Sequence, residues 1–377
     1  MRHFTIPIFV PELACPNRCV FCNQQKISGT LCQPTGEEVI EIIEKRLVTI
    51  APGNEVEIGF FGGNFTGIEP ELQEYYLSLA QQYADRGLVK DIRLSTRPDY
   101  INGDSLNLLK KYSVTNIELG AQSLDEQVLK LAGRGHSVED IRSASRLILE
   151  NGFQLGLQMM IGLPGDSLEK SISTARQIVA LGARNTRIYP TLVIKDTELE
   201  KLFRKGEYIP LSLEDAVNWT KEIVKIVEAG DVTILRIGLH PSDGILNGDT
   251  LVAGPFHVAF GEMVTSALWK DEFDKELSAG RKAEGVERKE QRAERTAHVG
   301  MRNEIECRLF ENRKGNLTGD LRKQGLLIVE VPPGQLNAAV GHKAENKKML
   351  LKKFNKVIFK ENPELERRNF NMRIGSC

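Results

Sequence analysis

Three cysteines lie within eight residues near the start of the chain, at Cys15, Cys19 and Cys22. Thiolates this closely spaced are typical ligands of iron–sulfur clusters, and they also occur in zinc sites. A four-iron cluster held only by protein needs four thiolates, so three would leave one iron open for chemistry. Zinc remains an alternative, with a histidine or a distant cysteine as fourth ligand, although no second close pair of cysteines follows. Ordinary buried thiols are the third interpretation.

The composition is that of a globular protein, with room for one large domain and a small one. Of 377 residues, 41% are hydrophobic and 27% charged, and the net charge is −1, so any patch that attracts nucleic acid must be local. Cys32, Cys307 and Cys377 are interpreted as ordinary thiols, because six cysteines in a chain this long do not form a disulfide framework. No signal peptide and no apolar run of about 20 residues is found. We therefore expect a cytoplasmic protein.

Short apolar runs alternate with amphipathic stretches over the first half of the chain. This alternation predicts a parallel sheet with right-handed crossovers. Polar and glycine-rich motifs follow successive predicted strands, as in a β/α barrel, and the GxGxxG of a dinucleotide site is absent after the first strand. We therefore predict a partial barrel of six strand–helix units rather than a Rossmann sheet. The predicted strands are residues 4–10, 56–62, 91–96, 116–120, 154–161 and 185–190.

The second half predicts three further segments. Residues 1–268 are assigned to the barrel and an extension, in which 251–262 form a loop and short helix that close the barrel mouth. Residues 269–300 carry mixed charges and predict a helical linker. Residues 301–377 predict a small α+β domain, with strands at 305–310, 326–331 and 357–359 and a helix at 336–354. Ten basic residues face five acids over 325–377, which gives +5 against −6 elsewhere and suggests an anionic partner.

Several motifs stand at the predicted strand ends. In GGNFT, Gly62 and Gly63 would let a ligand approach the backbone, although a tight turn explains the pair equally well. Each motif alone is weak. In order, however, CPNRCVFC, GGNFT, STRPD, ELGAQS, RGH, GLPGD, RIYPTLVIKDTEL and AGPFHVAFGE resemble the radical S-adenosylmethionine (SAM) domain of the Elongator catalytic subunit and its bacterial relatives. The resemblance covers residues 4–265.

The resemblance implies a set of ligands. Cys15, Cys19 and Cys22 would hold a [4Fe–4S] cluster, with SAM on the open iron. Phe21 would pack on the adenine. The methionine amino group would be bound by Gly62, Gly63 and Asn64, the last of which stands where many members have glutamate. Related oxygen-independent coproporphyrinogen oxidases imply further SAM contacts, which align with Thr96, Gln122, Arg134 and Gln158.

The implied chemistry is reductive cleavage of SAM to a 5′-deoxyadenosyl radical, with an electron donor such as flavodoxin or ferredoxin. No catalytic side chain is assigned. Elongator catalytic subunits continue into an acetyltransferase domain, but the only near match to its acyl-CoA loop, RKQGLL at 322–327, fails at the last position. Acetyltransferase chemistry is therefore not expected. No second cysteine cluster is present either, which argues against a methylthiotransferase.

The basic tail contains Gly341-His-Lys-Ala344, which is similar to the GXXG loop of KH domains that clamps a nucleic-acid backbone. Ala344 replaces the second glycine, and a solvated basic helix is the alternative. The favoured hypothesis is a radical SAM enzyme that modifies RNA, with tRNA held by this tail. Two alternatives are a radical SAM enzyme acting on a small metabolite or tetrapyrrole, and a non-catalytic relative that binds SAM or haem.

Overall fold

The computed structural model describes residues 3–11, 19–23, 33–239, 243–297 and 324–375. The chain divides into two compact units, Met1–Gly261 and Glu262–Cys377. Among the described residues, no helix combines the length and the apolar character needed to cross a membrane.

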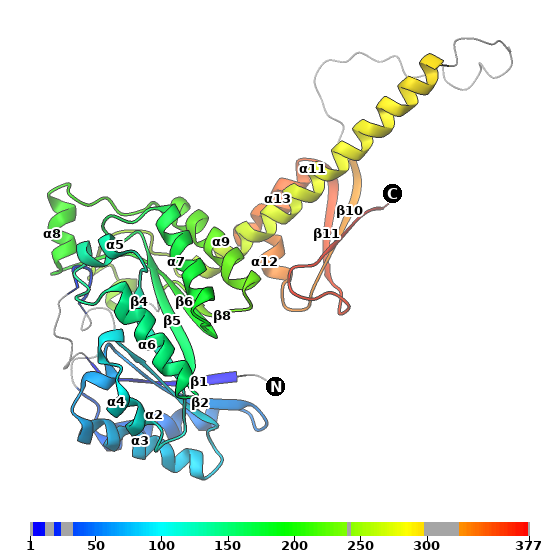
Figure 1. The fold of residues 1–377 in the computed structure, drawn as a ribbon. Helices are drawn as coiled ribbons and strands as arrows, with labels where there is room; N and C mark the ends of the chain where they lie inside the picture. The colour runs from blue at the N-terminus through cyan, green and yellow to red at the C-terminus, as the bar shows by residue number, and fades with distance from the viewer. Residues whose placement is uncertain (1–2, 12–18, 24–32, 240–242, 298–323, 376–377) are drawn as a thin grey trace, which may run out of the picture. The chain divides into compact units, whose positions relative to one another are not determined.

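The first unit is built on one curved parallel sheet (Figure 1). Each strand pairs with the next strand of this sheet along the chain, so the order never reverses as it does in a doubly wound sheet. The prediction of a partial barrel is thereby confirmed, and β8 adds a seventh strand to the six expected. The strands, in sheet order, are β1 (His3–Phe9), β2 (Glu55–Phe61), β3 (Asp91–Thr96), β4 (Val114–Gln122), β5 (Gln154–Ile161), β6 (Asn185–Pro190) and β8 (Thr233–Ile237).

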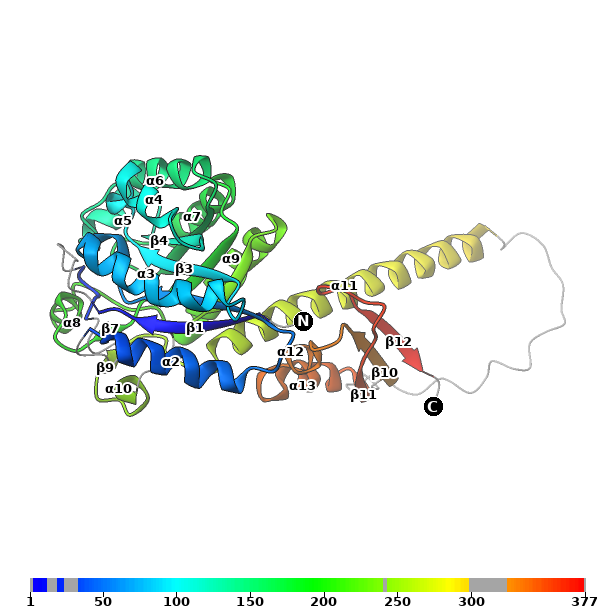
Figure 2. The same ribbon diagram turned by 90° about the horizontal axis from the view of Figure 1, so that it is seen from below.

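Helices cover one face of this sheet (Figures 1 and 2). Phe60 of β2 illustrates the packing, since its ring lies 6.1 Å from that of Tyr76 on α3. Three of the helices begin with a capping box, at Thr35, Asn102 and Ser137, which satisfies backbone N–H groups of the first turn. The covering helices are α2 (Gly36–Thr49), α3 (Pro70–Asp85), α4 (Gly103–Leu109), α6 (Val138–Glu150), α7 (Leu168–Ala180) and α9 (Leu213–Ala229).

Short elements gather at the carboxyl ends of the strands. They are α5 (Glu126–Leu131), α8 (Glu198–Arg204), α10 (Asp243–Leu246) and the two-stranded sheet of β7 (Val193–Ile194) and β9 (Leu251–Ala253). Figure 2 shows the head of β1 pointing toward the end of the unit where α8, β7 and β9 lie. The sequence predicted a loop and short helix at 251–262, whereas β9 forms there and the long α11 begins at Phe260.

The second unit packs helices on a three-stranded sheet of order β11–β10–β12. Trp269 and Phe273, which fall in the predicted linker, are fully buried in its core with Val329 and Val331. The predicted strand at 305–310 lies outside the described residues. The elements are α11 (Phe260–Ala297), β10 (Gln324–Val331), α12 (Leu336–Val340), α13 (Glu345–Leu351), β11 (Phe354–Glu361) and β12 (Asn371–Gly375).

The helix expected at 336–354 is interrupted. Gly341 has a φ of 91°, and a Cβ there would lie 2.8 Å from the backbone nitrogen of Asn346. Lys343 and Ala344 also have positive φ, so the chain turns between α12 and α13 instead of continuing as one helix. The short strand β12 was not predicted.

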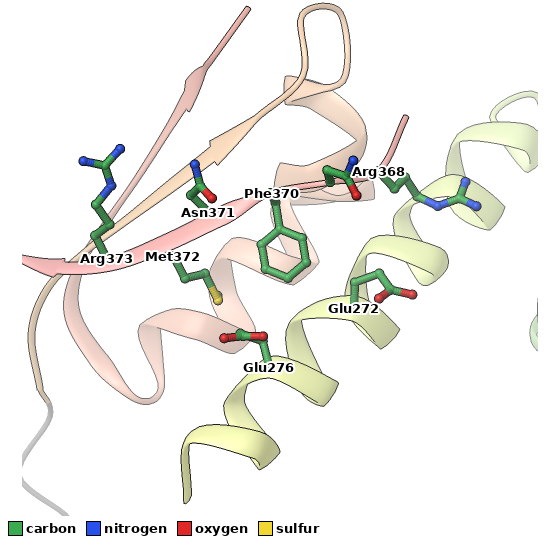
Figure 3. A pocket seen from close by; sticks show the side chains of 8 residues that line it. Glu272, Glu276, Arg368, Phe370, Asn371, Met372 and Arg373 are labelled. Atoms are coloured by element: carbon green, nitrogen blue, oxygen red, sulfur yellow. The ribbon is translucent and has the colours of Figure 1, made fainter. Parts of the chain in front are cut away.

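A pocket of about 610 Å³ lies on the second unit between α11 and β12 (Figure 3). Its lining mixes the acids Glu272 and Glu276 with Arg368 and Arg373 around the ring of Phe370. None of the motifs quoted above contributes to it. This pocket is therefore separate from the site that the sequence predicts.

Candidate active site

The predicted site residues that the structure describes lie in the first unit, on strands β1 to β5 near their carboxyl ends and on the loops that follow. Parallel strands bring these ends to one edge of the sheet. Cys19 and Cys22 are described, whereas Cys15 lies outside the described residues, as do Cys32, Cys307 and Cys377.

The cysteine loop is held by backbone hydrogen bonds to the end of α5 and to the first turn of α8. Val20 N donates to Ala132 O at 3.0 Å, and Leu199 N donates to Val20 O at 2.7 Å. Within the loop, Cys22 N donates to Cys19 O at 3.0 Å, which places both thiols on one turn. Cys19 is 4% exposed, and Cys22 is half-buried. The two thiols are thus fixed close together by segments distant in sequence.

Phe21, predicted to pack on adenine, lies between the two cysteines in an apolar cluster. It is 9% exposed and shares this cluster with Val128, Leu163 and Tyr208. Its burial contributes to anchoring the cysteine loop on the carboxyl ends of the strands.

Arg134, a predicted SAM contact, reaches the cysteine loop. Its Nη1 donates to Cys19 Sγ at 3.2 Å, and its Nη2 donates to Gly120 O at 2.5 Å. Its Nε is buried and has no hydrogen-bond partner among the described residues. Gln122, another predicted contact, likewise has a buried Oε1 without a described partner. Buried polar atoms are normally satisfied, so an unpaired donor on Arg134 and an unpaired acceptor on Gln122, two side chains that both lie by Gly120, fit a polar ligand with both functions.

The predicted amino-group site is the turn after β2. A Cβ on Gly62 would lie 2.3 Å from Val10 O, so this position needs glycine for the close approach to the end of β1. Gly63 has a φ of 142°, and a Cβ added to it would meet no atom within 4 Å, which leaves its backbone accessible to a ligand. The turn combines a fixed backbone with open space.

Asn64 and Thr96 are joined to each other. Thr96 Oγ1 donates to Asn64 Oδ1 at 2.8 Å and lies 2.5 Å from Thr66 Oγ1. The backbone nitrogen of Arg97 also donates to Asn64 Oδ1, at 3.3 Å. The Asn64 side chain therefore ties the glycine turn to the end of β3, and Thr96 is 1% exposed beneath it.

Gln158 projects from β5 on the face of the sheet opposite the helices. Its Nε2 lies 3.2 Å from both Ser95 Oγ and Glu118 Oε2. Glu118 also accepts hydrogen bonds from Arg93 Nη1 at 2.8 Å and Arg187 Nε at 2.6 Å. We call the set Glu57, Arg93, Glu118 and Arg187 the ion-pair layer, because Arg93 Nε in turn lies 2.7 Å from Glu57 Oε1.

This layer was not predicted from the sequence. Its members lie on strands β2, β3, β4 and β6, and the side chains of the two acids and Arg93 are less than 10% exposed. Burial works against the charged form of Arg187, but the hydrogen bonds and charge of Glu118 outweigh it and raise the pKa of the guanidinium. A usable signal was present: charges in otherwise apolar strands at alternating positions indicate buried pairing on one sheet face.

His136 supplies a test of the electrostatics around Arg134. Its side chain is fully buried, 3.9 Å from Asp99 Oδ1. Burial, followed by the charges of Arg134 and Arg97, lowers its pKa to about 4 from an ordinary 6.5. Between these values the unfolded chain takes up a proton that the folded protein does not. Stability should therefore fall as the pH drops from about 6.5 toward 4.

We expect His136→Gln to make the free energy of unfolding depend less on pH in this range. Urea unfolding of the cluster-free protein at pH 7, 5.5 and 4.5 measures that free energy. The carboxylates titrate in both proteins, so the difference between the two curves reports His136 alone. Parallel curves for the two proteins would contradict the expectation.

Comparison with known proteins places these observations in context. Residues 12–178 match the radical SAM superfamily, and residues 184–270 match the radical SAM C-terminal domain. The tRNA uridine(34) acetyltransferase of Methanocaldococcus infernus is 32% identical over 186 residues, 44% of this chain and 35% of that protein. Human Elongator complex protein 3 is 30% identical over 194 residues, 46% of this chain and 36% of that protein. The chain thus matches about a third of the length of these relatives.

A solved structure shows the same fold. The archaeal Elongator protein 3 of Methanocaldococcus infernus, with an N-terminal deletion, superposes with a TM-score of 0.59 at 23% identity. The match covers 72% of this chain and 63% of that one.

Proposed function

Since the chain belongs to the radical SAM superfamily, we propose that Cys15, Cys19 and Cys22 hold a [4Fe–4S] cluster and that SAM binds beside it. When bound, the cluster would supply one electron for reductive cleavage of SAM to methionine and a 5′-deoxyadenosyl radical, the species that would take a hydrogen atom from the substrate. The observation that carries the proposal is the unpaired Arg134 Nε, on the same guanidinium that donates to Cys19. It would donate to the carboxylate of SAM.

Other side chains would orient SAM around this contact. The open backbone of Gly63 would receive the amino group, and Asn64 would hold the turn in place through Thr96. Gln122 Oε1 would accept from a donor of the ligand. Gln158, already bonded to Glu118, would stand at the inner face of the sheet below the bound molecule. The packed loops would exclude water from the reacting atoms.

We propose RNA, and tRNA in particular, as the substrate class. The curated relatives include tRNA uridine(34) acetyltransferases, and residues 325–377 of the second unit carry ten basic residues against five acids. Six lysines on it form no ion pair with any described residue, while Lys360 and Arg373 are paired with Glu330. The six, which we call the lysine surface, are Lys343, Lys347, Lys348, Lys352, Lys353 and Lys356. Unpaired cations of this kind would contact phosphates.

The chemistry is tested by anaerobic reconstitution with iron and sulfide, reduction with dithionite, and addition of SAM. We expect 5′-deoxyadenosine and methionine in equal amounts. When bulk tRNA is present, both products should form faster or their formation should be coupled to modification of the tRNA. Absence of 5′-deoxyadenosine would overturn the enzymatic proposal and favour the non-catalytic alternative. Turnover stimulated by a small-molecule fraction, but not by tRNA, would favour the metabolite or tetrapyrrole alternative.

The lysine surface is tested separately by filter binding of tRNA at several salt concentrations. Lys348→Gln combined with Lys352→Gln should weaken binding and reduce the salt slope by about 0.7–0.9 for each phosphate that is no longer neutralised. The matched control is Lys45→Gln combined with Lys90→Gln, which changes the net charge equally but lies on the first unit. Equal weakening in both double variants would assign the effect to net charge alone and contradict the proposed surface.

A further inference from the structure

Arg97 of the STRPD motif has no role in the function proposed above, yet it is among the most buried charged residues. Its side chain is 2% exposed. Nε and Nη2 donate to the two carboxylate oxygens of Asp99, each at 2.9 Å. Nη2 also donates to the backbone oxygen of Arg134 at 2.8 Å. The bidentate pair fixes the plane of the guanidinium, so the bond to Arg134 has a defined direction.

Arg134 is consequently held at both ends of its backbone. Its nitrogen donates to Leu129 O at 3.0 Å, and its oxygen accepts from Arg97. The side chain projects from this fixed point to Gly120 O and to Cys19 Sγ. Arg97 and the end of α5 therefore together determine where Nη1 of Arg134 lies relative to the Cys19 sulfur.

We infer that Arg97 is a positioning residue that keeps the Arg134 guanidinium on the Cys19 sulfur and thereby raises the reduction potential of the cluster. The inference rests on the proposed function, because it assigns Cys19 to a cluster. Hydrogen bonds to cluster sulfurs stabilise the reduced state, which carries more negative charge. Asp99 supports this arrangement by holding the Arg97 guanidinium through two hydrogen bonds.

Arg97→Lys tests this inference without changing the charge. A lysine has one nitrogen on a flexible stem, so it cannot hold Asp99 in two places and Arg134 O at once. In the reconstituted protein we expect the cluster to have a more negative midpoint potential. The potential is measured by a redox titration in which the EPR signal of the reduced cluster is monitored. In the cluster-free protein we expect faster amide exchange over residues 132–136. Arg142→Lys, an exposed arginine on α6, is the control and should change neither.

A second variant separates positioning from a general loss of structure. Arg134→Lys should itself make the potential more negative, and adding Arg97→Lys to it should produce no further shift, because Arg97 acts through Arg134. Additive shifts would overturn the inference, as would an unchanged potential and exchange rate in Arg97→Lys. Wild-type protein that takes up no cluster would overturn the proposed function. Exchange over 132–136 would then still decide whether Arg97 positions Arg134.

Discussion

Cys19→Ser is expected to abolish both the bound cluster and the release of 5′-deoxyadenosine. A serine hydroxyl does not replace a cysteine thiolate as a ligand of the cluster iron. Cys19 also accepts the Nη1 hydrogen bond of Arg134, so its replacement removes a hydrogen bond as well as a ligand. Iron and sulfide content, visible absorption and 5′-deoxyadenosine measured after anaerobic reconstitution provide three readouts.

Cys32→Ser and Cys377→Ser are the controls, because both cysteines are interpreted as ordinary thiols. They should retain wild-type iron and activity. Wild-type iron content in Cys19→Ser would contradict the assignment. Stoichiometric zinc and no iron in the wild-type protein would instead support the zinc alternative that the cysteine spacing left open.

Glu118→Gln is expected to destabilise the first unit by about 3–5 kcal/mol, the usual cost of removing one partner from a buried ion pair. Glu118 is 1% exposed and pairs with both Arg93 and Arg187. The amide would leave Arg187 with unmatched charge, whereas Arg93 keeps Glu57 as a partner. The amide keeps the size of the side chain, so packing changes little. Urea unfolding of the cluster-free protein at neutral pH measures the effect.

Glu74→Gln is the matched control. It also removes one acid that pairs with a cation, but Glu74 and Lys111 are 42% and 62% exposed, and water screens the pair. The free energy of unfolding should change little. If the two variants were destabilised equally, the ion-pair layer would have no special role.

The sequence predicted the bounds of the strands well where glycine or proline interrupts the apolar run. The predicted spans 154–161 and 185–190 are those of β5 and β6, because glycine or proline follows each apolar run. Strand β8 extends the sheet beyond the six predicted strands, and nothing in the pattern of its residues indicated that it pairs with β6. Strand β12 has too few residues to display a period, and its partner β10 lies about 45 residues earlier in the chain.

The candidate site was predictable as a set of positions and not as a set of contacts. The motifs located the residues on successive strand ends, but the bond between Arg134 and Cys19 spans 115 residues and depends on sheet curvature. The structure brings Asn64 to Thr96, and Gln158 to Glu118, in the same way. Arg97 was quoted in a motif without a role, since only the folded chain shows that its guanidinium meets the Arg134 carbonyl.

The seven-stranded sheet has two edges, at β1 and β8, in the described part of the chain. A closed barrel has a radius set by strand number and shear, whereas an open arc has no such geometric condition. The ion-pair layer spans β2 to β6 across the concave side and joins strands that are not all neighbours. The paired side chains therefore bridge the concave face, and their lengths set the distances between the strands that they join. A side chain one methylene shorter than that of Glu118 would shorten one of these distances and alter the curvature on which the spacing of the strand ends depends.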